Sequence, residues 1–168
     1  NLKPVILKSN LNVAKYCIMK NIFDHNVTAE LISRINNLTP ETKQLWGKMS
    51  VSQMLAHCNV AYEMVYDDIH KPPTAFMKMA LQLLIKDKIT NEQPYKKNLQ
   101  TAPQFLIKDD KDFETEKKRL IAFIEKTREL GGEHFDGKKS MTLGKLSKTQ
   151  WNNMFYKHLD HHLSQFGV

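Results

Sequence analysis

Residues 147–166, SKTQWNNMFYKHLDHHLSQF, are the most informative stretch of this sequence. Ser147 and Gln150 stand three positions apart, which is the spacing of a capping box at the start of a helix. Apolar residues then recur every three or four positions, so the segment predicts an amphipathic helix. His158 and His162 lie one helical turn apart in the middle of the apolar arc. This helix therefore carries a candidate site on the face that should pack inward.

Three more long helices are expected upstream. The first covers residues 26–36, and the second starts at the capping box Ser50–Gln53 and continues to Tyr66. The third begins at Asp109-Asp110 and ends at Gly131-Gly132, where glycine favours termination. Four long helices predict an all-α fold, a four-helix bundle.

A long connection, residues 68–110, joins the second and third long helices. A connection of this length in a compact domain is usually functional or covers other elements. Within it, Thr74–Ile85 predicts a short amphipathic helix, and we expect this helix to cover the metal end of the bundle as a lid. Packing at the opposite end is the alternative. A further short helical turn is expected from Pro40 to Trp46.

The histidine pair suggests a metal site. Side chains four residues apart on a helix can bind one ion, and His57 in the second helix is the best third ligand for His158 and His162. The three residues reach one level only if their two helices are antiparallel. The second and third helices could then be parallel, which requires a long crossover. Alternatively, the pair could be cationic histidines stabilising a helix C-terminus. Candidates for hydrogen bonds to the ligands are Gln165, Glu63, Gln53 and Tyr62.

Two motifs together resemble the DinB-like superfamily of metal-binding four-helix bundles, in a branch of unknown function. They are Trp46–Ser50 continuing through Gln53–His57, and His158–Gly167. The resemblance covers residues 20–168 and implies a metal triad of His57, His158 and His162. It also implies zinc or nickel, and a reaction that uses a small cofactor thiol. Ser140–Gly144 departs from the family's pattern before the last helix.

Two classes of function follow. In the first, the protein is a divalent-metal-dependent enzyme that performs thiol transfer or hydrolysis through a metal-activated thiol or water, with Glu63 or Tyr62 assisting as base or orienting group. In the second, the bundle binds a metal or a partner without catalysis. An open metal position facing a cavity favours the first class, and a closed fourth ligand favours the second.

Composition limits the remaining possibilities. The 168 residues are 41% hydrophobic and carry a net charge of +7, with lysines spread along the chain and no nucleic-acid-binding motif, so no nucleic-acid partner is expected. No apolar run is long enough for a membrane span, and Cys17 and Cys58 are expected to stay reduced in the cytoplasm. We expect a domain at 19–168 after an N-terminal extension, 1–18. Expected partners are a small-molecule substrate or thiol and no membrane, with a homodimer left open.

Overall fold

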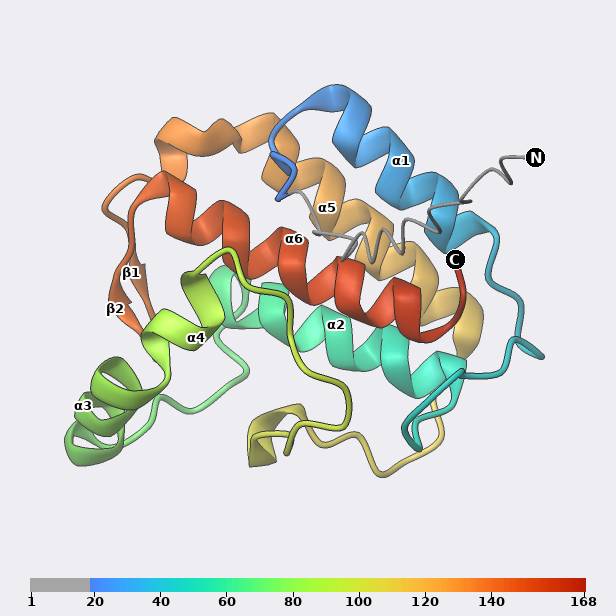
Figure 1. The fold of residues 1–168 in the computed structure, drawn as a ribbon, viewed down its shortest axis with the longest axis horizontal. Coiled ribbons are helices and arrows are strands. Elements are labelled where there is room, and N and C mark those ends of the chain that lie inside the picture. Colours follow the sequence, from blue (N-terminus) through green and yellow to red (C-terminus); the bar gives the residue numbers. More distant parts are fainter. Residues whose placement is uncertain (1–18) are drawn as a thin grey trace, which may run out of the picture.

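Four long helices run side by side through the computed structural model, which describes residues 19–168 (Figure 1). They are α1 (His25–Asn36), α2 (Val51–Tyr66), α5 (Phe113–Phe135) and α6 (Lys148–Gln165). Helices α1 and α6 run in one direction, whereas α2 and α5 run in the other. The prediction of an all-α four-helix bundle is confirmed, and so is the parallel orientation of the second and third long helices.

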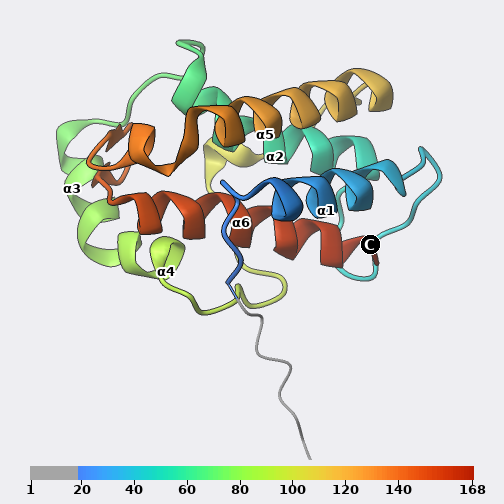
Figure 2. The same ribbon diagram turned by 90° about the horizontal axis from the view of Figure 1, so that it is seen from above.

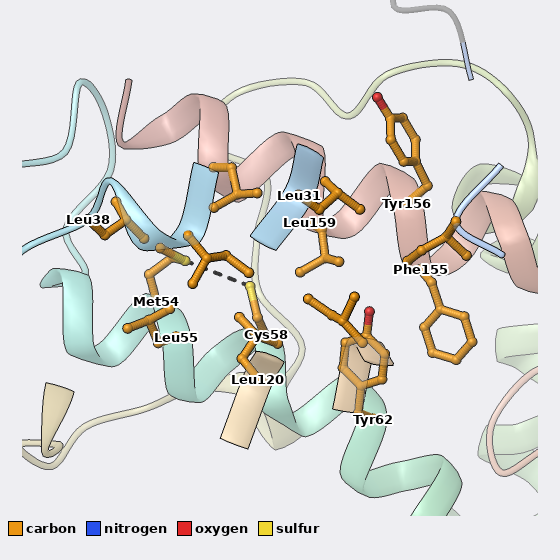
Figure 3. Close-up of a cluster of buried hydrophobic side chains, with 14 of the residues drawn as sticks. Leu31, Leu38, Met54, Leu55, Cys58, Tyr62, Leu120, Phe155, Tyr156 and Leu159 are labelled. Carbon is orange, nitrogen blue, oxygen red and sulfur yellow. Dashed lines mark hydrogen bonds between the residues drawn. The ribbon is translucent and has the colours of Figure 1, made fainter. Parts of the chain in front are cut away.

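The core lies where the four helices face one another (Figure 3). Leu31 of α1, Cys58 of α2, Leu120 of α5 and Leu159 of α6 are each at most 1% exposed. Burial of such apolar side chains is the main favourable contribution to folding. Cys58 is a free thiol, as predicted, and lies 3.8 Å from the sulfur of Met54. The prediction also named Cys17, which lies outside the described residues.

Local hydrogen bonds start the helices at the positions that the sequence indicated. Ser50 and Ser147 both form complete capping boxes, because each hydroxyl accepts from the backbone three residues later and the glutamine there returns a hydrogen bond. Helix α5 starts at Phe113, three residues after Asp110. The N-cap is Asp112, whose carboxylate accepts a hydrogen bond from Thr115 N. The regular path of α5 ends as predicted at Gly131 (φ 70°), although one more turn continues to Phe135.

The predicted helical turn between Pro40 and Trp46 is wrong. A single turn closes from Thr42 N to Thr39 O, and the chain then extends to the end of α6. There Leu45 N donates to Gln165 O at 2.8 Å. A tertiary hydrogen bond therefore replaces the helical one in this segment.

The crossover between α2 and α5 contains three short helices. They are α3 (Ala75–Leu84), α4 (Lys86–Thr90) and the 3-10 helix η1 (Pro103–Phe105). A two-stranded antiparallel hairpin, β1 (Lys139–Ser140) and β2 (Gly144–Lys145), precedes α6 and was not predicted.

Helix α3 forms as predicted, but its expected position as a lid is wrong. It lies beside the hairpin, at the end of the bundle where α6 begins (Figures 1 and 2). His57 lies in the first half of α2 and His158 and His162 in the second half of α6, nearer the opposite end. None of the helices between residues 19 and 168 is long and apolar enough to cross a membrane.

Candidate metal centre

His57 is held on α2 with its imidazole turned toward α6. The residue is 5% exposed, and its Nδ1 lies 2.9 Å from the carbonyl oxygen of Phe105 in η1. The Phe105 ring also packs near His57 and His158, with centroid distances of 5.4 and 5.9 Å. The segment that covers the histidines is therefore η1, which begins 18 positions after the end of the helix predicted to cover them, Thr74–Ile85.

His158 and His162 come from successive turns of α6, and their ring centroids are 4.8 Å apart. His162 is 8% exposed, and its Nδ1 lies 2.8 Å from Oε1 of Gln165. This bond confirms the prediction that Gln165 is a hydrogen-bond partner of one of the three histidines. The i, i+3 spacing of His162 and Gln165 on α6 brings these two side chains together.

The amide of Gln165 is fixed from its other end by the loop before α2. Its Nε2 donates to the carbonyl oxygen of Trp46 at 2.8 Å. Gly47 has φ +85°, and a Cβ atom at this position would clash with Nε2 of Gln165. A glycine is needed here for both its backbone angle and its lack of a side chain. The loop thus forms a close-fitting support for Gln165.

The hydrogen-bond network determines which nitrogens face the centre. A carbonyl oxygen only accepts, so Nδ1 of His57 must donate to Phe105 O. Gln165 donates through Nε2 to Trp46 O, which leaves Oε1 to accept from Nδ1 of His162. In their neutral forms, both imidazoles therefore present an unprotonated Nε2. The Nε2 atoms of His57 and His158 are 3.0 Å apart, and one nitrogen from each of the three histidines lies within 4.8 Å of the others.

The surroundings keep the three imidazoles neutral. Burial lowers the pKa of His57, although its hydrogen bond to Phe105 offsets part of this effect. Burial, followed by the nearby His162 and His57, lowers the pKa of His158 well below its usual value. Burial, together with the repulsion that a protonated His57 would exert, lowers the pKa of His162 to about 3, although its hydrogen bond to Gln165 acts in the opposite direction. Neutral imidazole is the form that binds metal ions, so this group could hold an ion at neutral pH.

The other three residues that were predicted to hydrogen-bond to the histidines contact different parts of the molecule. Tyr62 is 1% exposed and stacks on Phe155 at a centroid distance of 4.9 Å, and its hydroxyl has no hydrogen-bond partner among residues 19–168. Gln53 completes the capping box at Ser50. The structure does not bring either side chain to the histidine nitrogens.

Glu63 is a buried member of a partly exposed ionic network between α2 and α5. One carboxylate oxygen pairs with Arg119, and the other lies 2.7 Å from Nε2 of His70. Arg119 also contacts Glu116, which accepts a hydrogen bond from Asn59. These contacts favour a structural role for Glu63, and its assignment to catalysis stays a prediction, as does that of Tyr62.

A cavity of about 170 Å³ lies beside α6, next to the histidine cluster: its lining residue His161 packs edge-on against His162 at a centroid distance of 5.0 Å. His161 also contacts Trp46 and Tyr95 edge-on. The Lys97 ammonium lies 4.1 Å from the centre of the Trp46 ring. Trp46 is thus shared between the cavity and the Gln165 support, which only the tertiary structure reveals.

The fold and the site together define an all-α bundle with three converging histidines that could hold a metal ion. The chain belongs to the family described as "Protein of unknown function (DUF1569)", whose model matches residues 20–167. This match includes all four long helices and the three histidines. No curated protein and no solved structure matches the sequence.

Proposed function

We propose that His57, His158 and His162 bind one divalent ion, zinc or nickel, and that the protein is a metal-dependent enzyme of the DinB-like type. The reaction would be thiol transfer or hydrolysis. The observation that carries the proposal is the pair of hydrogen bonds at Nδ1 of His57 and His162. They hold each ring in the tautomer whose Nε2 has a free lone pair directed into the cluster.

The protein's own residues would bind and orient in this mechanism. Three neutral histidines leave at least one coordination position for a ligand from solution. The ion, when bound, would lower the pKa of a water or thiol and so supply a nucleophile at neutral pH. Phe105 would restrict water at the His57 side, because its ring packs against two of the three histidines.

A non-catalytic metal-binding bundle is the second candidate. The contacts of Glu63 and Tyr62 favour it, because Glu63 pairs with Arg119 and Tyr62 stacks on Phe155. If no other acid or base reaches the substrate, proton transfer would depend on the metal-bound group itself. The two candidates differ in turnover and not in metal content, so both quantities must be measured.

The test of metal binding uses protein purified without an affinity tag or chelator. Elemental analysis should find about one equivalent of zinc or nickel. His158→Ala should lose it, whereas His161→Ala should keep it, because His161 lies on the same helix and faces the cavity. Full metal retention in His158→Ala would overturn the proposed site.

The test of catalysis follows with the same preparations. Metal-loaded protein should transfer small thiols to electrophilic acceptors or hydrolyse an ester or amide, and chelation should abolish this activity. Stoichiometric metal without any such turnover would favour the non-catalytic bundle.

A further inference from the structure

Helix α3 presents its apolar residues to solvent. None of its ten residues is buried, and five of its six large apolar side chains are exposed. The exposed fractions are 74% for Phe76, 49% for Met77, 53% for Met79, 76% for Leu83 and 68% for Leu84. At 100° per residue these five side chains lie within one arc of about 160° on the helix. A contiguous exposed apolar patch of this kind marks an interaction site.

The opposite side of the helix is held against the protein. Gln82 packs so closely on the hairpin that a Cβ atom at Gly144 would lie 3.0 Å from its Cδ. In the following helix, Lys86 donates a hydrogen bond to Lys145 O at 2.7 Å. Thr74 caps the N-terminus of α3 by accepting from Met77 N. These contacts fix the orientation of α3, so its apolar arc faces outward in a defined direction.

The region around α3 is basic. Segments 67–90 and 136–147 contain seven lysines and four acidic residues, whereas the rest of residues 19–168 has 15 basic and 14 acidic residues. Lys71, Lys88, Lys139 and Lys145 are exposed in these two segments. These two segments thus carry a net charge of +3, against +1 for the other described residues. Helix α3 lies beside the hairpin in both views (Figures 1 and 2).

We propose that α3 docks this protein on an anionic lipid surface. An interfacial helix inserts its apolar side chains at the boundary between headgroups and acyl chains, and nearby lysines are attracted to anionic headgroups. Phe76, Met79 and Leu83 would insert, and the exposed lysines of α4 and the hairpin would face the headgroups. This contact is peripheral and needs no membrane-spanning segment. It departs from our expectation of no membrane partner, which rested on the lack of a spanning segment.

Charge and shape favour this occupant over a second copy of the chain. A symmetric dimer through α3 would place two positively charged ends against each other. Ten residues of helix are only about 15 Å long, and a specific protein interface buries at least roughly 1,000 Å². A flat lipid surface suits a single protruding helix, because it does not need a complementary groove.

The experiment measures co-sedimentation of the full chain with vesicles. Phosphatidylcholine vesicles with phosphatidylserine should bind the protein, and vesicles of phosphatidylcholine alone should not. The double variant Phe76→Glu/Leu83→Glu should reduce binding about tenfold or more. Leu99→Glu is the matched control, because Leu99 is another exposed leucine (57%) that lies outside α3. Lys88→Glu/Lys139→Glu should also weaken binding, and added salt should have the same effect.

Circular dichroism and metal content should be unchanged in all these variants, which keeps a folding defect from imitating the result. Absence of vesicle binding by the native chain would overturn the proposal. Equal binding of the Phe76→Glu/Leu83→Glu variant, or equal binding to neutral vesicles, would also overturn it. So would a dimer in light scattering that the α3 double variant abolishes while vesicles have no effect.

Discussion

At the scale of single residues, Gln165 links the histidine cluster to the rest of the fold. It is 4% exposed, accepts from His162 and donates to Trp46 O. A partner of this kind fixes the ring orientation of a metal ligand. It is a positioning residue, since it reaches the proposed ion only through His162.

Replacing Gln165 with Leu should weaken metal affinity by about 10–100-fold. Leucine has a similar volume but cannot accept from Nδ1 of His162, so the imidazole loses its fixed tautomer. Competition with a chromogenic chelator measures the affinity. Gln93→Leu, at an exposed glutamine, is the control and should have no effect. Equal affinities of the two variants would show that Gln165 does not position His162.

Gly47→Ala should disturb the same support from the side of the loop. A Cβ atom there would clash with Gln165 Nε2, and the residue would also have to adopt a positive φ angle. The angle alone costs roughly 1–2 kcal/mol for a residue with a side chain. We expect a larger loss of unfolding free energy in urea than this, together with weaker metal binding.

Gly131→Ala separates the effect of the positive φ angle from the effect of the clash with Gln165. Gly131 has φ +70°, but no atom lies within 4 Å of a Cβ built at this position. This variant should lose only the free energy due to the backbone angle and should bind metal normally. If the two alanine variants behaved alike, the contact between Gly47 and Gln165 would have no separate effect.

At the scale of elements, the parallel pair α2 and α5 is joined by more than apolar packing. Glu63, which is 7% exposed, is bound by Arg119 of α5 and by His70 in the loop after α2. A buried carboxylate needs such partners, because removal from water disfavours its charge. The network therefore defines how α2 meets both α5 and the beginning of the crossover.

Glu63→Ala should lower the free energy of unfolding by about 1–3 kcal/mol, because it leaves Arg119 and His70 without their shared acceptor. The exposure of Arg119 keeps the loss below that of a fully buried pair. Metal content should not change. Glu129→Ala is the control, since its side chain is 68% exposed, and should cost at most roughly 0.5 kcal/mol. A loss of turnover without loss of stability would instead support the predicted catalytic role of Glu63.

At the scale of the whole molecule, burial of neutral histidines makes folding depend on pH. Their pKa values are lowered in the folded state, to about 3 for His162, whereas an unfolded chain keeps values near 6.5. Between these limits the unfolded state binds more protons. The free energy of unfolding must therefore fall as pH decreases.

Metal-free protein should be most stable above pH 6.5 and should lose up to about 1.4 kcal/mol per pH unit for His162 as the pH falls toward 3. Urea unfolding at several pH values between 7 and 4.5 measures this slope. His162→Gln should give a shallower slope, because glutamine does not titrate. Parallel curves for the two proteins would contradict the assignment of a neutral buried imidazole to position 162.

Short-range features of this protein could be predicted from sequence. The capping boxes at Ser50 and Ser147, the helical pair His158 and His162, and the bond from His162 to Gln165 all join residues within one turn. Such contacts form whenever the local helix forms, so periodicity and cap residues suffice to predict them. The choice of His57 as the third histidine also succeeded, because antiparallel α2 and α6 bring it to the same level.

Contacts between distant segments were decided by the tertiary structure. Phe105 O lies 48 positions from His57, and Trp46 O lies 119 positions from Gln165. The path of a long crossover follows from how its ends pack and not from its local periodicity. For this reason α3 was predicted as a helix but placed over the wrong end of the bundle, and η1 was missed where it covers the histidines. Helix propensity is a local property, whereas the position of a helix depends on the surfaces that it can bury.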